Sequence, residues 1–180
     1  MDFIIELNDI GILIYIFKLL IISIFSYKTF FKIINKKEGT IFCKIRNYII
    51  ITITSILCGM LKYYINIWIC ILMLVIIISI LLANETNTNI LYSSIIFTIS
   101  LGINYGIFLV ATAISFFPAA FFNIINKYIN FIIITVIYLI IWFWIQKMKR
   151  FKNGLIFLQT KISDESLDIF ILNACTIVII

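Results

Sequence analysis

The chain has 180 residues, of which 64% are hydrophobic and only 12% are charged. A soluble domain is roughly half apolar, and here the excess falls in long continuous runs, so we expect membrane spans rather than a soluble domain. The net charge of +6 does not indicate a nucleic-acid partner, because 11 of the 14 basic residues lie in two loops beside apolar runs, which is the positive-inside pattern of membrane proteins.

The order of apolar and polar stretches predicts an all-α, polytopic helix bundle with about six apolar segments. A helix rises about 1.5 Å per residue, so roughly 20 residues cross a hydrocarbon core of ~30 Å. The apolar block from 48 to 83 is too long for one crossing, and we divide it near the polar residues at 62–66. The expected spans are residues 10–27, 48–64, 65–83, 90–117, 131–146 and 168–180, the last of which is short.

Two basic loops predict the orientation of the chain. Lysine and arginine accumulate at residues 28–46 and 147–161, and loops rich in these residues remain on the cytoplasmic side of a membrane. We therefore expect a multi-pass protein of the cell membrane, with both loops in the cytoplasm and the N-terminus outside. The polar stretch 84–89 should share the cytoplasmic side by the number of crossings, although it contains no Lys or Arg.

Lys18 lies near the middle of the first expected span. An ionisable group inside a span is a functional candidate. The alternative, which we favour, is that the helix starts earlier, near Phe3, and that the Lys18 side chain extends towards a polar region.

Three lysines follow the first span at intervals of four residues. Lys28, Lys32 and Lys36 therefore share one helix face. The residues between them include Phe30, Phe31, Ile33 and Ile34. This pattern predicts an amphipathic extension that lies in the headgroup region of the bilayer.

The long apolar run from 90 to 117 contains a G-x-x-x-G sequence. Small residues at helical spacing allow two helices to approach closely. We favour packing of this stripe inside the same bundle, and a homodimer interface is the alternative. Asn104 and Thr112 are polar groups that need partners at this depth. The stripe consists of Thr98, Gly102, Gly106 and Ala113.

Pro118 should end this helix, because proline lacks a backbone donor and clashes with the preceding turn. The outer segment that follows, residues 118–130, is rich in aromatic and amide side chains. Such side chains suit a small apolar peptide, so Phe121, Phe122 and Asn126 are candidate ligand-binding residues. The alternative, which we favour, is an aromatic belt at the membrane interface.

Residues suited to catalysis are scarce. The chain has no histidine, and its sequence contains no nucleotide-binding, metalloprotease or serine-hydrolase motif. None of its carboxylates falls well inside an expected span. The four cysteines form no C-x-x-C pair and are interpreted as small buried hydrophobes. We therefore expect no enzymatic activity, no cofactor and no metal site.

The second basic loop and the segment after it carry a resemblance. They read Lys149-Arg-Phe-Lys-Asn-Gly-Leu-Ile-Phe-Leu-Gln159 and Asp164-Glu-Ser-Leu-Asp-Ile-Phe-Ile-Leu-Asn173. With the preceding hydrophobic pattern, they resemble the membrane sensor region of peptide-sensing histidine kinases of Gram-positive bacteria, the accessory gene regulator type with a GHKL ATPase. The resemblance implies a polytopic quorum-sensing receptor for a secreted peptide, coupled to a cytoplasmic kinase. The family's phospho-accepting histidine and ATP site have no counterpart here. The family's partner peptidase depends on His and Cys, and the missing His argues against that interpretation.

We therefore expect a membrane sensor or receptor module for signal transduction. Its expected partners are the lipid bilayer, a small peptide ligand and a second copy of the chain. A small transport or permease-associated subunit is the alternative function. The final apolar run, 169–180, would reach only about 18 Å, so we expect a receptor truncated before its kinase domain; the alternative is a natural end, with this run packed as a half-span.

Overall fold

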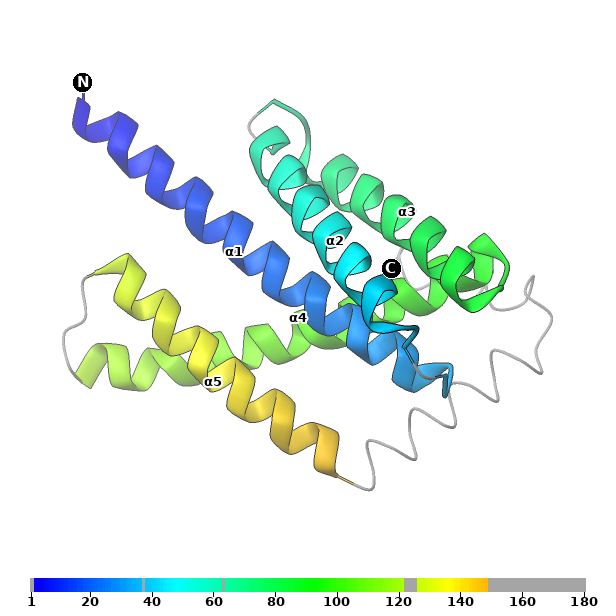
Figure 1. Cartoon of the computed structure of the whole chain (residues 1–180). Helices are drawn as coiled ribbons and strands as arrows, with labels where there is room; N and C mark the ends of the chain where they lie inside the picture. Colours follow the sequence, from blue (N-terminus) through cyan, green and yellow to red (C-terminus); the bar gives the residue numbers. More distant parts are fainter. Residues whose placement is uncertain (1, 37, 63, 122–125, 149–180) are drawn as a thin grey trace, which may run out of the picture.

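The structure, a computed structural model, describes residues 2–36, 38–62, 64–121 and 126–148. These residues form five α-helices and no strand (Figure 1), so the predicted all-α class is confirmed. The sixth expected segment, 168–180, and the second basic loop beyond residue 148 lie outside the described residues. The helices are α1 (Asp2–Ile33), α2 (Ile41–Leu61), α3 (Ile67–Thr86), α4 (Ile90–Phe121) and α5 (Lys127–Lys147).

All five helices are long and apolar enough to cross a bilayer. Their ends differ from the expected spans where polar residues continue the helix. α2 begins at Ile41 rather than at 48, α3 continues to Thr86 rather than ending at 83, and α5 begins at Lys127 rather than at 131. In each case the hydropathy pattern marks the apolar part of a helix, while backbone hydrogen bonding extends it by about one or two turns.

Four helices form a ring, and the fifth packs outside it. α1 contacts α2 and α4, and α3 contacts the same two helices, so the order around the ring is α1–α2–α3–α4. α5 packs mainly against α4, which crosses behind α1 in Figure 1. Aromatic rings also join α5 to α1, because Phe25 lies edge-on against Trp142 with 4.6 Å between the ring centroids.

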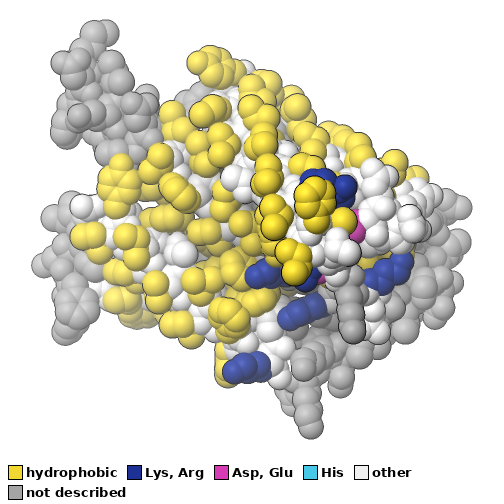
Figure 2. All heavy atoms as spheres, viewed as in Figure 1, with side chains coloured by type: hydrophobic (Ala, Val, Ile, Leu, Met, Phe, Trp, Pro, Cys, Tyr) yellow, Lys and Arg dark blue, Asp and Glu magenta, His cyan; other side chains and the backbone are white. Residues whose placement is uncertain are grey.

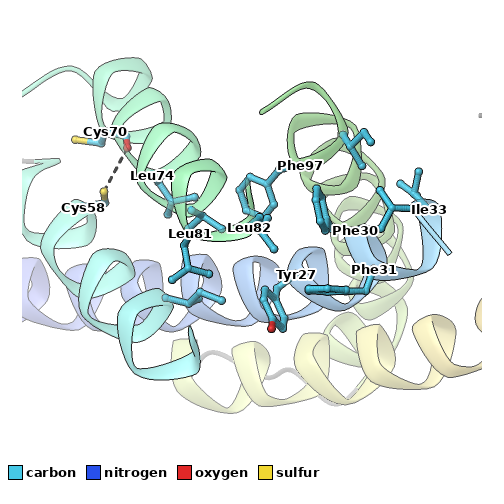
Figure 3. Packing of buried hydrophobic residues seen from close by; sticks show 14 residues of the cluster. Tyr27, Phe30, Phe31, Ile33, Cys58, Cys70, Leu74, Leu81, Leu82 and Phe97 are labelled. Carbon is cyan, nitrogen blue, oxygen red and sulfur yellow. Dashed lines mark hydrogen bonds between the residues drawn. The ribbon is translucent and has the colours of Figure 1, made fainter. Parts of the chain in front are cut away.

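The larger core cluster lies where the second half of α1 meets α3 and α4. Phe30 of α1 and Phe97 of α4 are fully buried there, with Leu82 of α3 beside them (Figure 3). Phe31, Ile33 and Ile34 are buried in the same cluster. The predicted amphipathic extension in the headgroup region is therefore wrong, because these side chains pack into the core that α1 shares with the other helices.

The outer surface of the bundle is apolar, as Figure 2 shows for one face. Large aliphatic side chains that are 42–59% exposed recur on α2 and α3 at helical intervals. A continuous apolar surface of this kind suits contact with lipid. On the face that Figure 2 shows, the visible basic side chains gather towards the end of the bundle where α1 and α5 finish (Figures 1 and 2). The aliphatic series consists of Ile45, Ile49, Ile53, Leu57, Ile69, Leu72, Ile76 and Ile80.

The sequence predicted that Pro118 ends its helix, but α4 continues to Phe121. Proline removes one backbone donor, and membrane helices tolerate this when nearby groups satisfy the freed carbonyl oxygens. The carbonyl freed by Pro118 is that of Ile114, four residues before it. The helix then ends within one turn of the proline.

Candidate functional site

A polar cluster joins three helices at the end of the bundle that carries the first basic loop. The Glu85 carboxylate, in the last turn of α3, accepts a hydrogen bond from the Tyr27 hydroxyl of α1 at 3.2 Å. The Asn47 amide of α2 donates to the same carboxylate and to the Tyr27 hydroxyl at 3.1 Å. Tyr27 and Asn47 are completely buried. We call Tyr27, Asn47 and Glu85 the Glu85 cluster.

The Glu85 cluster also holds the loop between α1 and α2. The Gly39 backbone N–H donates to Glu85 Oε1 at 2.9 Å. A Cβ at Gly39 would lie only 3.0 Å from that oxygen, so a glycine leaves the room that this contact needs. Lys36 Nζ donates to the Thr86 carbonyl oxygen at 2.6 Å, close to the C-terminus of α3, where a cation is favoured by the helix dipole.

These contacts place the polar stretch 84–89 at the same end of the bundle as the first basic loop. Asn84, Glu85 and Thr86 belong to α3 rather than to a free loop, and Asn87 caps the helix with a left-handed backbone, φ 52°. The stretch has no basic residue of its own, but Lys36 of the first basic loop bonds to it at Thr86 and brings a positive charge there. The number of crossings put this stretch on the same side as the first basic loop. Its contacts with that loop agree with this expectation.

A second polar cluster lies among α1, α4 and α5. Asn104 of α4 is completely buried. Its amide donates to Thr29 Oγ1 of α1 at 3.1 Å and to the Ser100 carbonyl at 2.8 Å. Its Oδ1 accepts from the Tyr138 hydroxyl of α5 at 3.1 Å. Asn104 thus finds the partners that a polar group at this depth requires, and we call Thr29, Asn104 and Tyr138 the Asn104 cluster.

α1 and α5 are joined again at the ends where both helices finish. Lys32 Nζ donates to Gln146 Oε1 and lies 5.3 Å from the centroid of the Trp142 ring. Because Lys147 ends α5, these contacts put the start of the second basic loop beside the first. Both basic regions therefore lie at one end of the bundle, as far as the structure describes them.

The other half of α1 makes contacts of a different kind. From Gly11 to Phe25, no described side chain of α1 donates a hydrogen bond to another helix. Instead, Lys18 Nζ lies 4.9 Å and 5.1 Å from the ring centroids of Phe108 and Tyr105 of α4. α1 does begin earlier than residue 10, at Asp2, as we favoured, but the Lys18 ammonium group packs over these rings rather than extending towards a polar region.

A close helix contact lies at the same level of the bundle. Gly59 of α2 faces Ile16 of α1, and a Cβ at Gly59 would overlap the Ile16 side chain and lie 3.4 Å from its Cα. The absence of a side chain therefore lets the two backbones approach. Gly59 lies outside the small-residue stripe that the sequence indicated.

The predicted ligand-binding residues are only partly described. Asn126 caps α5, because its side chain accepts from the Tyr128 backbone N–H at 2.9 Å. Phe121 is the last residue of α4, and Phe122 lies outside the described residues. The outer turn is shorter than expected, since the two helices take up most of residues 118–130.

The small-residue stripe on α4 is not covered by the described part of the chain. Thr98, Gly102 and Ala113 are exposed. A Cβ built at Gly102 or Gly106 would meet no atom within 4 Å. The packing within the bundle that we favoured is therefore not seen among the described residues, and the homodimer interface stays a prediction.

The described residues contain no group of three His, Cys, Asp or Glu side chains that could hold a metal ion. Cys58 and Cys70 are buried free thiols, and Cys58 Sγ donates to the Cys70 carbonyl at 3.3 Å (Figure 3). Cys43 is only half-buried, and Cys175 lies outside the described residues. The interpretation as small buried hydrophobes therefore fits Cys58 and Cys70.

Sequence reasoning missed Tyr27, Asn47 and Glu85. Asn47 stands beside basic residues and Glu85 lies in a polar stretch, so both resemble solvated loop residues. An available signal was that each lies within one turn of a long apolar run, where a polar side chain needs a partner. No protein-family model, curated protein or solved structure matches the chain.

Proposed function

We propose that the chain is a multi-pass membrane sensor or receptor module for signal transduction, without enzymatic activity of its own. The observation that supports this most directly is the unequal distribution of polar contacts along α1. Its hydrogen bonds to other helices come from Ser26, Tyr27, Thr29 and Lys32. The described side chains that precede them, from Gly11 to Phe25, make ring contacts and aliphatic packing, which can rearrange at lower cost than buried hydrogen bonds.

This asymmetry suits a receptor that binds its ligand at one end and transmits at the other. A small secreted peptide would bind at the end formed by the N-terminal half of α1 and the turn before α5. The Glu85 and Asn104 clusters would then carry a shift of α1 to the two basic regions, which we place in the cytoplasm. A ligand produces such a change only if it binds one arrangement of the helices more tightly than the other.

A small transport or permease-associated subunit is the second candidate. It is favoured by Ser23, Ser55 and Ser79, one each on α1, α2 and α3, whose hydroxyls are buried without a hydrogen-bond partner. Unsatisfied hydroxyls inside a bundle can serve a polar substrate that passes between the helices.

Spin labels on the full chain in lipid vesicles test the proposed function. We would attach them to Leu13→Cys of α1 and Leu109→Cys of α4, both about half-exposed, in a cysteine-free background. The probe is the peptide fraction below about 2 kDa from spent medium of the source organism. A receptor predicts a shift in the distance between the labels, and no flux of ions or small solutes into the vesicles.

A matched pair on α2 and α3, Ile53→Cys and Ile76→Cys, serves as the control and should show no shift. Solute flux without a distance change would favour the transport function and contradict the receptor. A shift that persists after protease treatment of the fraction would contradict a peptide ligand.

A further inference from the structure

Two lysines lie near each other in the half of the bundle that lacks the polar clusters. Lys62 caps α2, and its Nζ lies 4.0 Å from the centroid of the Tyr15 ring of α1. Lys18, one turn further along α1, lies over Tyr105 and Phe108. Because Tyr15 lies one turn before Lys18 on α1, the Lys62 ammonium group lies beside the turn that carries Lys18. The arrangement therefore concentrates positive charge between α1, α2 and α4.

None of the described side chains, which on α1 begin at Gly11, neutralises this charge. The one salt bridge among the described residues joins Lys44 to Glu38 in the α1–α2 loop, at the opposite end of the bundle. Lys18 lies seven residues after Gly11, where the candidate span begins, which is about 10 Å along the helix axis. A cation at that depth is costly unless it is paired, and contacts with aromatic rings offset only part of the cost.

The surface beside Lys18 is apolar and open to the side of the bundle. Leu13 and Phe17 of α1 are 48% and 49% exposed, and Tyr105 and Leu109 of α4 are 44% and 50% exposed. Such a surface suits an acyl chain, while the two ammonium groups suit a single negative group held between them. The ligand that combines both properties is an anionic lipid.

We propose that Lys18 and Lys62 bind the phosphate of an anionic phospholipid whose acyl chains lie against α1 and α4 in the leaflet at the Lys62 end. The two ammonium groups donate charge-assisted hydrogen bonds to the phosphate oxygens. The bound lipid fills the space beside the part of α1 from Gly11 to Phe25, whose described side chains donate no hydrogen bond to another helix. This site is independent of the proposed receptor function.

A local fluorescence assay on the full chain in vesicles tests the site. A fluorophore on Leu109→Cys, in a cysteine-free background, reports contact with spin-labelled lipid. We expect spin-labelled phosphatidylglycerol to bind there about tenfold more tightly than spin-labelled phosphatidylcholine, the difference that charge-assisted contacts give. The variant with Lys18→Met and Lys62→Met should lose this preference, and Lys18→Arg should keep it.

Lys28→Met is the matched control, because Lys28 lies over Phe25 on the same helix at 5.3 Å but near the opposite end; it should keep the preference. If Lys18→Met does not fold, Lys62→Met alone, at a helix end, should still weaken the preference severalfold. Equal binding of the two lipids, or an equal loss in Lys28→Met, would overturn the proposal. If inorganic phosphate in the buffer removed the preference, the site would bind a free anion, and the proposal of a lipid ligand would be overturned.

Discussion

Replacing Asn104 with alanine should destabilise the bundle by about 2–4 kcal/mol. The change removes hydrogen bonds from Asn104 to Thr29 and from Tyr138 to Asn104, and such bonds between membrane helices contribute about 0.6 kcal/mol each. It also leaves the Tyr138 hydroxyl, which is fully buried, without its partner, at a cost of about 1–3 kcal/mol. Thr29 loses less, because its hydroxyl still donates to the Phe25 carbonyl.

The assay is unfolding of the purified chain in mixed micelles by titration with sodium dodecyl sulphate, followed by circular dichroism and tryptophan fluorescence. Coincident transitions from the two signals would justify a single free energy of unfolding. Thr112→Ala is the control on the same helix, because the Thr112 hydroxyl is exposed and bonds only to the Phe108 carbonyl of α4. We expect this control to change stability by less than about 0.5 kcal/mol.

A double-mutant cycle with Tyr138→Phe separates the hydrogen bond from the lost volume. If Asn104 and Tyr138 interact directly, the double variant should be more stable than the sum of the single effects predicts, by about 0.5–1.5 kcal/mol. Two results would refute the reasoning: additive single effects, or an Asn104→Ala variant as stable as Thr112→Ala.

Three further predictions concern helix contact, the α1–α2 loop and orientation. Gly59→Val should lower the free energy of unfolding by about 1–3 kcal/mol in the same titration, because the new side chain meets α1. Gly106→Val is the control and should change it little, because a Cβ there meets no atom within 4 Å. Equal losses in the two variants would contradict the close contact at Gly59. Glu85→Ala should accelerate amide hydrogen exchange at Gly39, which loses its acceptor, and unchanged exchange would show that the loop is held by other contacts. A membrane-impermeant thiol reagent outside the cell should label a cysteine placed at Asn126 but not one placed in the α1–α2 loop, and the reverse pattern would invert the orientation.

The helices could be predicted from the sequence because long apolar runs have few alternative folds in a membrane. Each of the five helices that the structure describes overlaps one expected span. The helix ends could not be predicted, since polar residues such as Glu85 continue a helix only when tertiary partners accept them. Tyr27 lies 58 residues from Glu85, and hydropathy carries no information about that pairing.

The candidate site was harder to predict because it depends on which helix faces meet. The sequence indicated that Asn104 needs polar partners, but it did not identify which residues these are. The G-x-x-x-G pattern indicated close packing on α4, whereas the close contact among the described residues is at Gly59, where a single glycine suffices. Lys18 was expected to reach towards a polar region, and its position over two rings of α4 follows from the crossing of α1 and α4, which the pattern of one chain does not fix.

The hydrogen bond from Lys36 to the Thr86 carbonyl has a consequence for how the chain is inserted during synthesis. The turn between α3 and α4 has no Lys or Arg, so it lacks the usual charge signal for retention on one side. The basic loop before α2 is synthesised first and can be held by its own charges. Because Lys36 and Gly39 bond to the end of α3, the α3–α4 turn must lie on the same side of the membrane as this loop, so one set of positive charges suffices for both turns.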